Sequence, residues 1–274
     1  MTKDKCPICL TKTEVEHELK DVFIHNCHAC KHRHSVLKDN ITEEYDDNYY
    51  INKHKNWFNN PDITLYKIIV TLLSKRNVSS LLDIGCGNGN LLKYIKSQLK
   101  ELQLTGIDLS SVQGFDDVKI INQSFLEYEW SEKYDVITSL ATIEHIAEVS
   151  DFVTKVHSKL SKGGIFFVMT MNDDSILYRA SRILKALGLR KSFKRLYDKH
   201  HINHFSHHSL KKLLKQKGFS IEKSYLHDAP LKSLDIEHSH KIEHIINKFA
   251  VTALFFIGRI TKKTYLQSIV AVKA

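Results

Sequence analysis

The stretch LLDIGCGNGN, at residues 81–90, limits the possible folds more than any other part of this chain. It opens as a short apolar run with one carboxylate inside it, Asp83, and it closes with glycines at three alternate positions: Gly85, Gly87 and Gly89. A helical pattern, NLLKYIKSQL, follows directly. Glycine lets a backbone turn sharply between a strand and a helix, and it lets a ligand come close to that backbone. We therefore expect a buried strand, a ligand-binding turn and a helix.

The spacing of these glycines separates several kinds of nucleotide site. A phosphate-binding P-loop requires Lys followed by Ser or Thr after its last glycine, whereas Asn90 and Leu91 stand here. A dinucleotide fold typically has G-x-G-x-x-G, and this chain reads G-x-G-x-G. The next predicted strand, in LTGIDLS, ends with Asp108, a carboxylate placed to accept hydrogen bonds from ribose hydroxyls. This pattern favours a ligand that carries a ribose.

Strand and helix patterns alternate along the rest of the chain. The predicted strands are 80–84, 104–108, 119–122, 134–139, 165–171, 219–226 and 267–273. The predicted helices begin with one at residue 63 and continue with 90–100, 146–160, 176–187 and 209–217. This alternation predicts an α/β fold with a doubly wound sheet of seven strands, whose ligand site lies at the carboxyl ends of the strands.

Two C-x-x-C pairs stand within the first thirty residues, with a possible hairpin between them. This is the spacing of a zinc ribbon, in which four thiolates close a tetrahedral, structural Zn²⁺ site. An iron centre is an alternative, as is the replacement of one thiolate by His25, His28, His32 or His34. The expected metal ligands are Cys6, Cys9, Cys27 and Cys30.

Four stretches occur in an order and spacing that resembles class I S-adenosylmethionine-dependent methyltransferases: LLDIGCGNGNLL, GIDLS, YDVITSLATIEHI and LSKGGIFFVMTMN. The resemblance covers about residues 63–218. It implies S-adenosylmethionine as the cofactor and methyl transfer as the reaction. Such a transfer needs an in-line approach of the nucleophile to the methyl group, exclusion of water and often one base.

The resemblance also implies roles for individual residues. Asp83 would lie under the glycine turn near the methionine amino group, Asp108 would hold the ribose, and Leu109 would flank the adenine. Ser124 and Phe125 would line the base. The residues expected to bind the cofactor are Asp83, Gly85, Gly87, Asn88, Gly89, Asp108, Leu109, Ser124, Phe125 and Leu140.

Histidines are the candidates for the base. His145 follows the fourth predicted strand in the motif IEHI, beside Glu144, and should emerge at the rim of the site. The later segment DKHHINHFSHHSLKKLLKQKGFSI resembles one in a subgroup that acts on sugars, lipids, quinones and other small molecules. It implies that His200, His201 and His204 lie near the methyl group, although each is also compatible with a loop or capping role. We name His145, His201 and His204 as candidate catalytic residues.

Two segments are expected to cover the acceptor. The polar stretch YDDNYYINKHKNWF resembles one in ribbon-bearing sugar and small-molecule methyltransferases, which makes Tyr45, Tyr49 and Tyr50 candidates for a lid. The segment 175–201 is crowded with basic residues, among them Arg179 and Arg195. It is compatible with sugar-linked phosphates, an anionic membrane surface, RNA phosphates or plain solvation.

We expect three parts along the chain: a four-cysteine zinc ribbon at 1–38, a linker and aromatic lid at 39–62, and a methyltransferase domain at 63–274. A basic cap insertion at about 174–205 and a helical insertion at about 229–264 interrupt this domain. The helix at 242–260 is expected to pack on the domain or on a second subunit, as in a homodimer. No signal-peptide pattern is present at the N-terminus, which favours a cytoplasmic location.

The predicted function is methyl transfer to a small, anionic acceptor such as a sugar or nucleotide-linked sugar, in surface-polysaccharide or secondary-metabolite synthesis. The formal net charge of +9 suits an acidic partner but does not choose among them. The alternative is an RNA methyltransferase that docks through its ribbon, and a third hypothesis is a binding scaffold without turnover. Peripheral membrane contact is compatible with the charge.

Overall fold

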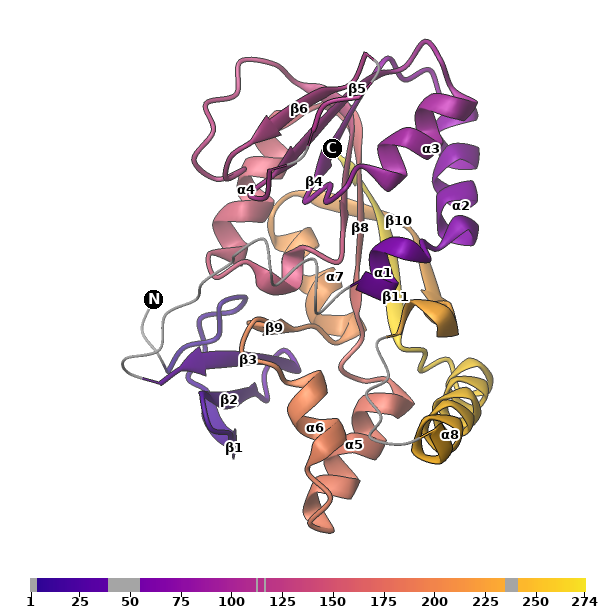
Figure 1. Cartoon of the computed structure of the whole chain (residues 1–274). Coiled ribbons are helices and arrows are strands. Elements are labelled where there is room, and N and C mark those ends of the chain that lie inside the picture. Colours follow the sequence, from indigo (N-terminus) through magenta and orange to yellow (C-terminus); the bar gives the residue numbers. More distant parts are fainter. Residues whose placement is uncertain (1–3, 39–54, 112, 116, 235–240) are drawn as a thin grey trace.

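A seven-stranded sheet forms the centre of the computed structural model, which describes residues 4–38, 55–111, 113–115, 117–234 and 241–274 (Figure 1). The strand order is β10-β11-β8-β7-β4-β5-β6, and β11 runs antiparallel to both of its neighbours. The strands are β4 (Ser80–Ile84), β5 (Gln103–Asp108), β6 (Lys119–Asn122), β7 (Tyr134–Leu140), β8 (Leu160–Met171), β10 (Phe219–His227) and β11 (Leu266–Lys273). The predicted α/β doubly wound fold and its seven strands are confirmed.

Helices cover both faces of this sheet because successive residues of its central strands point to opposite sides. Leu81 packs with α2 and α3, whereas its neighbour Leu82 packs with α4 and α7. In the same way, Phe167 packs on the face covered by α2 and α3, and Phe166 packs on the face covered by α4 and α7. The helical elements are α1 (Lys55–Asn59), α2 (Ile63–Ser74), α3 (Asn90–Gln98), η2 (Ile143–His145), α4 (Val149–Lys159), α5 (Ile176–Ala186), α6 (Lys191–Leu196), α7 (His207–Gln216), η3 (Leu231–Ser233) and α8 (Lys241–Ile260).

The strand order reverses at β4. The chain runs from β4 through α3 to β5 and β6 on one side, and β7 then pairs with β4 on the other side. Crossovers that leave in opposite directions open a crevice at the carboxyl ends of the strands. The end of β4, at Asp83 and Ile84, therefore faces the crevice where a ligand is expected.

The N-terminal segment forms a second, antiparallel sheet of four strands, in the order β1-β2-β3-β9. The first three, β1 (Glu14–Glu18), β2 (Val22–Cys27) and β3 (His32–Leu37), lie between and after the two C-x-x-C pairs. The fourth, β9 (Asn203–His204), comes from the segment between α6 and α7, and the sequence analysis did not predict it. The predicted boundary at residue 38 stays a prediction.

The small sheet packs against the segment that follows β8. Val22 and Ile24 on β2 share one apolar cluster with Tyr178 on α5 and with Phe193 and Tyr197 on α6 and just after it. Figure 1 shows β1 to β3 beside α6 and β9, on the opposite side of α5 from α8. The predicted cap segment thus supports the small sheet.

A buried carboxylate, Asp173, joins these parts. Its side chain is fully buried and accepts hydrogen bonds from Arg33 Nη1 of β3 at 2.5 Å, Arg182 Nη1 of α5 at 3.1 Å and the Tyr197 hydroxyl at 2.5 Å. Arg33 also donates to Glu16 on β1. A buried charge of this kind is tolerated because several charged and polar donors surround it.

Helix α8 packs against α5, and its Phe255 lies 5.9 Å from Tyr265 between ring centroids. The side of α8 that carries Phe255 therefore makes the expected contact with the large domain. Among the helices that the structure describes, we find none with the length and apolarity needed to cross a bilayer.

We expect Arg33→Met to lower the free energy of unfolding by about 3 kcal/mol, because it leaves Asp173 buried with one cationic partner fewer. Urea denaturation measures this change. The matched control is Arg76→Met, which breaks the exposed pair with Glu222 and should cost less than about 1 kcal/mol. Equal losses in the two variants would contradict the role given to the buried network.

Candidate active site

The glycine turn after β4 is held by hydrogen bonds that its N–H groups donate to β5. The N–H of Gly85 donates to the carbonyl of Ile107 at 2.8 Å, and the N–H of Gly87 donates to Asp108 Oδ2 at 2.8 Å. Gly85 has φ +72°, and a β-carbon there would lie 2.2 Å from Thr142 Oγ1. Only glycine fits this position, because both the backbone angle and the neighbouring side chain exclude a larger residue.

Asp108 ends β5 and forms the floor of the turn. Besides the contact with Gly87, its Oδ1 accepts hydrogen bonds from the Ser110 N–H at 2.9 Å and the Ser110 hydroxyl at 2.6 Å. An ionised carboxylate offers about four acceptor positions, so these three bonds leave capacity for a further donor. The side chain lies on the cavity wall, where that donor would come from a ligand.

Asp83 lies deeper, at the end of β4. It accepts a hydrogen bond from Thr138 Oγ1 on β7 at 2.7 Å. Burial raises the pKa of Asp83 to about 7, and the nearby charge of Asp108 pushes in the same direction. Near neutral pH this carboxyl is therefore poised between its two protonation states.

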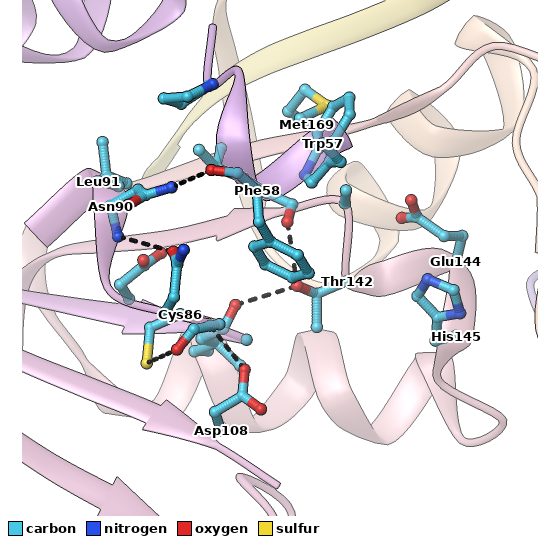
Figure 2. A pocket seen from close by; sticks show the side chains of 18 of the residues that line it. Trp57, Phe58, Cys86, Asn90, Leu91, Asp108, Thr142, Glu144, His145 and Met169 are labelled. Atoms are coloured by element: carbon cyan, nitrogen blue, oxygen red, sulfur yellow. Dashed lines mark hydrogen bonds between the residues drawn. The ribbon is translucent and has the colours of Figure 1, made fainter. Parts of the chain in front are cut away.

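A cavity of about 290 Å³ extends from the glycine turn toward β8 and η2. Figure 2 shows Asp108 and Cys86 at one end, Glu144 and His145 at another, and Phe58 between them. The predicted residues that line this cavity are Asp83, Gly85, Gly87, Asn88, Asp108, Leu109, Ser124, Phe125, Leu140, His145 and His201. One cavity thus brings together predicted residues from five separate stretches of the sequence.

Two aromatic residues of α1, Trp57 and Phe58, cover the turn, and the sequence analysis did not single them out. A β-carbon on Gly87 would lie 2.6 Å from the Phe58 ring, and Asn90 Nδ2 donates to the Phe58 carbonyl at 2.7 Å. The sequence carries a signal for them, because both residues end the aromatic stretch whose tyrosines were predicted to form a lid. Those tyrosines, Tyr45, Tyr49 and Tyr50, lie outside the described residues.

The far end of the cavity carries acid–base groups. Glu144 is buried on η2 and accepts a hydrogen bond from Thr170 Oγ1 at 2.7 Å, and burial raises the pKa of Glu144 to about 7. His145 Nδ1 lies 2.7 Å from the carbonyl oxygen of His200. A carbonyl only accepts, so Nδ1 carries the proton of the neutral ring and Nε2 holds its lone pair.

His201 completes this end of the cavity. Its ring centroid lies 5.0 Å from that of His145, and Tyr265 lines the same wall. Burial raises the pKa of Tyr265 to about 12, with Glu144 contributing in the same direction. Tyr265 therefore acts as a neutral hydroxyl at ordinary pH.

Four predicted site residues are not among the described residues that line the cavity. His204 is buried on β9, 2.9 Å from Ser35 Oγ, and burial holds its pKa well below the usual range. Gly89 instead begins α3 with φ +75°. Arg179 and Arg195 lie on α5 and α6 and are likewise not among the residues that line the cavity, and Arg179 contacts Asp174 at 3.6 Å. The predicted contacts of these four residues with the ligands stay predictions.

The four N-terminal cysteines form one cluster, with their sulfur atoms all within 4.8 Å of one another. Cys6 Sγ lies 3.4 Å from Cys30 Sγ, and Cys9 Sγ lies 3.4 Å from Cys27 Sγ. Sulfur atoms about 3.8 Å apart surround a tetrahedral Zn²⁺ with bonds of about 2.3 Å, so the cluster fits this ion. Of the histidines named as alternatives, His25 contacts Thr13 and His32 contacts Asn203.

Comparison with known families gives the identity of the large domain. A family model described as a methyltransferase domain matches residues 62–224, which is more than half of the chain. The chain belongs to this methyltransferase family. Its large domain has a Rossmann-like fold, as the sequence predicted, and the four-cysteine cluster before it fits a zinc ribbon.

Curated relatives match part of this chain. The ubiquinone biosynthesis O-methyltransferase of Mesorhizobium japonicum is 31% identical over 118 residues, or 40% of this chain and 44% of the relative. The (S)-tetrahydroprotoberberine N-methyltransferase of Eschscholzia californica is 28% identical over 100 residues, 32% of this chain and 29% of the relative. The chain covers less than half the length of these relatives.

Solved structures share the fold over a longer range. The 1,6-didemethyltoxoflavin-N1-methyltransferase of Burkholderia thailandensis, solved with S-adenosylhomocysteine, has a TM-score of 0.57 at 12% identity and covers 95% of this chain and 99% of its own. A chain from the Haloferax volcanii complex of the Trm112 methyltransferase activator with a methyltransferase has a TM-score of 0.60 at 13% identity, covering 84% and 97%.

Binding of S-adenosylmethionine should weaken by about tenfold for each pH unit below 7. The expected partner of Asp83 is the cationic amino group of the cofactor, so the carboxyl must be ionised to bind. Below its pKa of about 7, binding must displace a proton. Calorimetry with the wild type and Asp83→Asn measures this, and the variant should bind weakly without that slope. Glu144→Gln is the matched control, and loss of the slope in this variant instead would assign the titration to Glu144.

The enzyme purified without added metal should carry one Zn²⁺ per chain, and Cys27→Ser should lose most of it because three thiolates remain. Elemental analysis by mass spectrometry measures the content. Cys86→Ser is the control, because this buried cysteine belongs to the glycine turn and should leave the metal in place. Iron in the wild type, or no metal at all, would contradict the assignment.

Proposed function

We propose that this enzyme transfers a methyl group from S-adenosylmethionine to an oxygen or nitrogen atom of a small acceptor bound beside Glu144 and His145. The observation that carries the proposal is the single cavity, which runs from the glycine turn to a cluster of acid–base side chains. The cofactor and the acceptor would each occupy one end, which is the arrangement that an in-line transfer requires.

The residues of the cofactor end take the roles that the resemblance implies. The glycine turn and Asp108 would hold the ribose, Asp83 would pair with the amino group, and Ser124 and Phe125 would line the adenine. Bound S-adenosylmethionine supplies a methyl group on a positively charged sulfur. Trp57 and Phe58 would exclude water from this group, because they cover the turn from above.

The acceptor end offers two candidate bases. Glu144 has a pKa of about 7, close to the operating pH at which a general base works best. His145 presents Nε2 as its basic nitrogen, and its ring is held by the carbonyl of His200. Either group would remove the proton of the acceptor hydroxyl or amine, with His201 orienting the acceptor beside it.

A sugar or nucleotide-linked sugar hydroxyl is the acceptor that we propose. The similarity of the histidine-rich segment to that of sugar and small-molecule enzymes supports it, and so does the modest size of the cavity. Arg179 and Arg195 lie away from the cavity wall, so a phosphate of the acceptor would be bound by other groups. Synthesis of a surface polysaccharide or a secondary metabolite is the corresponding role.

The proposal is tested by transfer of labelled methyl from S-adenosylmethionine into an extract of the source cells, separated into RNA, lipid, polysaccharide and small-molecule pools. Label in the small-molecule or polysaccharide pool is expected. Label confined to RNA would overturn the proposal and would make the ribbon and the basic segment the docking surface. Binding of the cofactor without label in any pool would favour a scaffold.

Variants at the acceptor end are the controls of this experiment. Glu144→Gln and His145→Gln should bind the cofactor as the wild type does, and the variant that removes the base should lower the rate of transfer by about 10²- to 10⁴-fold. Asp108→Ala should lose cofactor binding as well as transfer. Full activity in both of the first two variants would exclude Glu144 and His145 as the base.

A further inference from the structure

Helix α8 exposes a long apolar stripe. Phe249 is 77% exposed and Ile242 is 72% exposed, and the other large exposed apolar side chains of α8 recur at steps of three, four or seven residues. Such steps place side chains on one side of a helix. The exposed apolar residues of α8 are Ile242, Ile245, Ile246, Phe249, Phe256, Ile257 and Ile260. A stripe of this length marks a surface that binds something apolar.

The opposite side of α8 is fixed to the enzyme. Phe255 is buried against Tyr265, and a β-carbon on Gly258 would lie 2.8 Å from the carbonyl of Lys263. Lys191 Nζ of α6 pairs with Glu243 Oε1 at 2.9 Å near the start of α8. The helix is thus held in place while its apolar stripe faces outward.

Helix α5, which packs against α8, and the loop after it also expose large apolar side chains. Ile183 near the end of α5 is exposed, as are Leu187 and Leu189 directly after it. Figure 1 shows α5 and α8 next to each other at one end of the molecule, away from the edge strand β6. We call these residues of α5, its following loop and α8 the apolar face.

The chain around the apolar face is strongly basic. Residues 183–199 and 241–262 contain ten lysines and arginines but only two acidic residues, Asp198 and Glu243. Arg190, Lys191 and Lys194 are exposed where α6 begins. Their charge, next to exposed apolar side chains, is the combination with which helices bind lipid headgroups.

We infer that the apolar face docks on the surface of an anionic lipid bilayer, with α8 lying in the plane of the headgroups. A second copy of the chain suits this surface less well. A two-fold dimer through the face would bring the same basic clusters toward each other, and like charges repel. An anionic bilayer supplies both the apolar layer and the opposite charge.

Helix α8 lies next to the cavity through the side opposite its apolar stripe. Tyr265 lines the cavity wall and stacks on Phe255 of α8, and Ser233 of η3, shortly before α8, lines the wall as well. The enzyme would therefore work at the membrane surface. This inference concerns where the enzyme lies and does not depend on which acceptor it methylates.

Co-sedimentation with vesicles tests the inference. The wild type should sediment with vesicles of phosphatidylglycerol and phosphatidylcholine. Its affinity for vesicles of phosphatidylcholine alone should be lower by about tenfold or more. The double variant Phe249→Asp, Phe256→Asp should lose binding by about tenfold or more, because it places two charges in the apolar layer. Val15→Asp is the matched control, an exposed apolar residue on β1 that should leave binding unchanged.

A variant at an exposed charge tests vesicle binding without disturbing the packing of the protein. Lys194→Glu should weaken vesicle binding, and added salt should weaken the wild type, whereas Lys162→Glu at the start of β8 should have no effect. All variants should keep methyl transfer to a soluble acceptor, which separates this test from that of the proposed function. Wild type that stays in solution with anionic vesicles would overturn the inference. So would a dimer, seen by light scattering, that the double Asp variant dissociates.

Discussion

The buried carboxylate of Asp173 is the interaction on which the assembly of this enzyme depends. It follows β8, and its donors come from the ribbon, from α5 and from the residue after α6. A charge buried so deeply costs free energy unless all of its partners are in place. The ribbon, the basic segment and the end of the central sheet therefore stabilise one another.

This assembly reaches the acceptor end of the cavity through backbone contacts. The N–H of Ser35 on β3 donates to the carbonyl of Ile202 at 2.7 Å, and the N–H of Ile202 donates to the carbonyl of Glu144 at 2.9 Å. Asn203 Nδ2 donates to the carbonyl of Ile146 at 2.6 Å. The segment that pairs with the ribbon thus contacts η2 at Glu144 and the chain just after it at Ile146, which links the ribbon to the turn that carries Glu144 and His145.

Much of the large domain could be predicted from the sequence because its signals are local. Buried strands read as apolar runs, and β4 and β6 begin and end at the predicted residues. The glycine spacing and Asp108 likewise placed one end of the cavity. These features depend on neighbours in the chain, which a sequence displays directly.

The parts that were missed depend on contacts between distant segments. His201 and His204 stand in the same histidine-rich segment. His204, however, pairs with β3 and does not line the cavity. The strand β9 has only two residues and forms because β3 offers an edge to it. No local sequence pattern distinguishes Trp57 from the aromatic residues before it. Likewise, the sequence of α8 does not show whether its apolar stripe is exposed or buried.

The pairing of β3 with β9 also sets an order on folding. His32 and its partner Asn203 are 171 residues apart, so β9 leaves the ribosome long after the cysteines and the first three strands. During that interval the outer edge of β3 has no strand beside it, and open edges invite pairing with other chains. The shortness of β9 leaves only two residues of that edge to be closed at the end. The four-stranded sheet is therefore completed only after the chain has been made as far as residue 204.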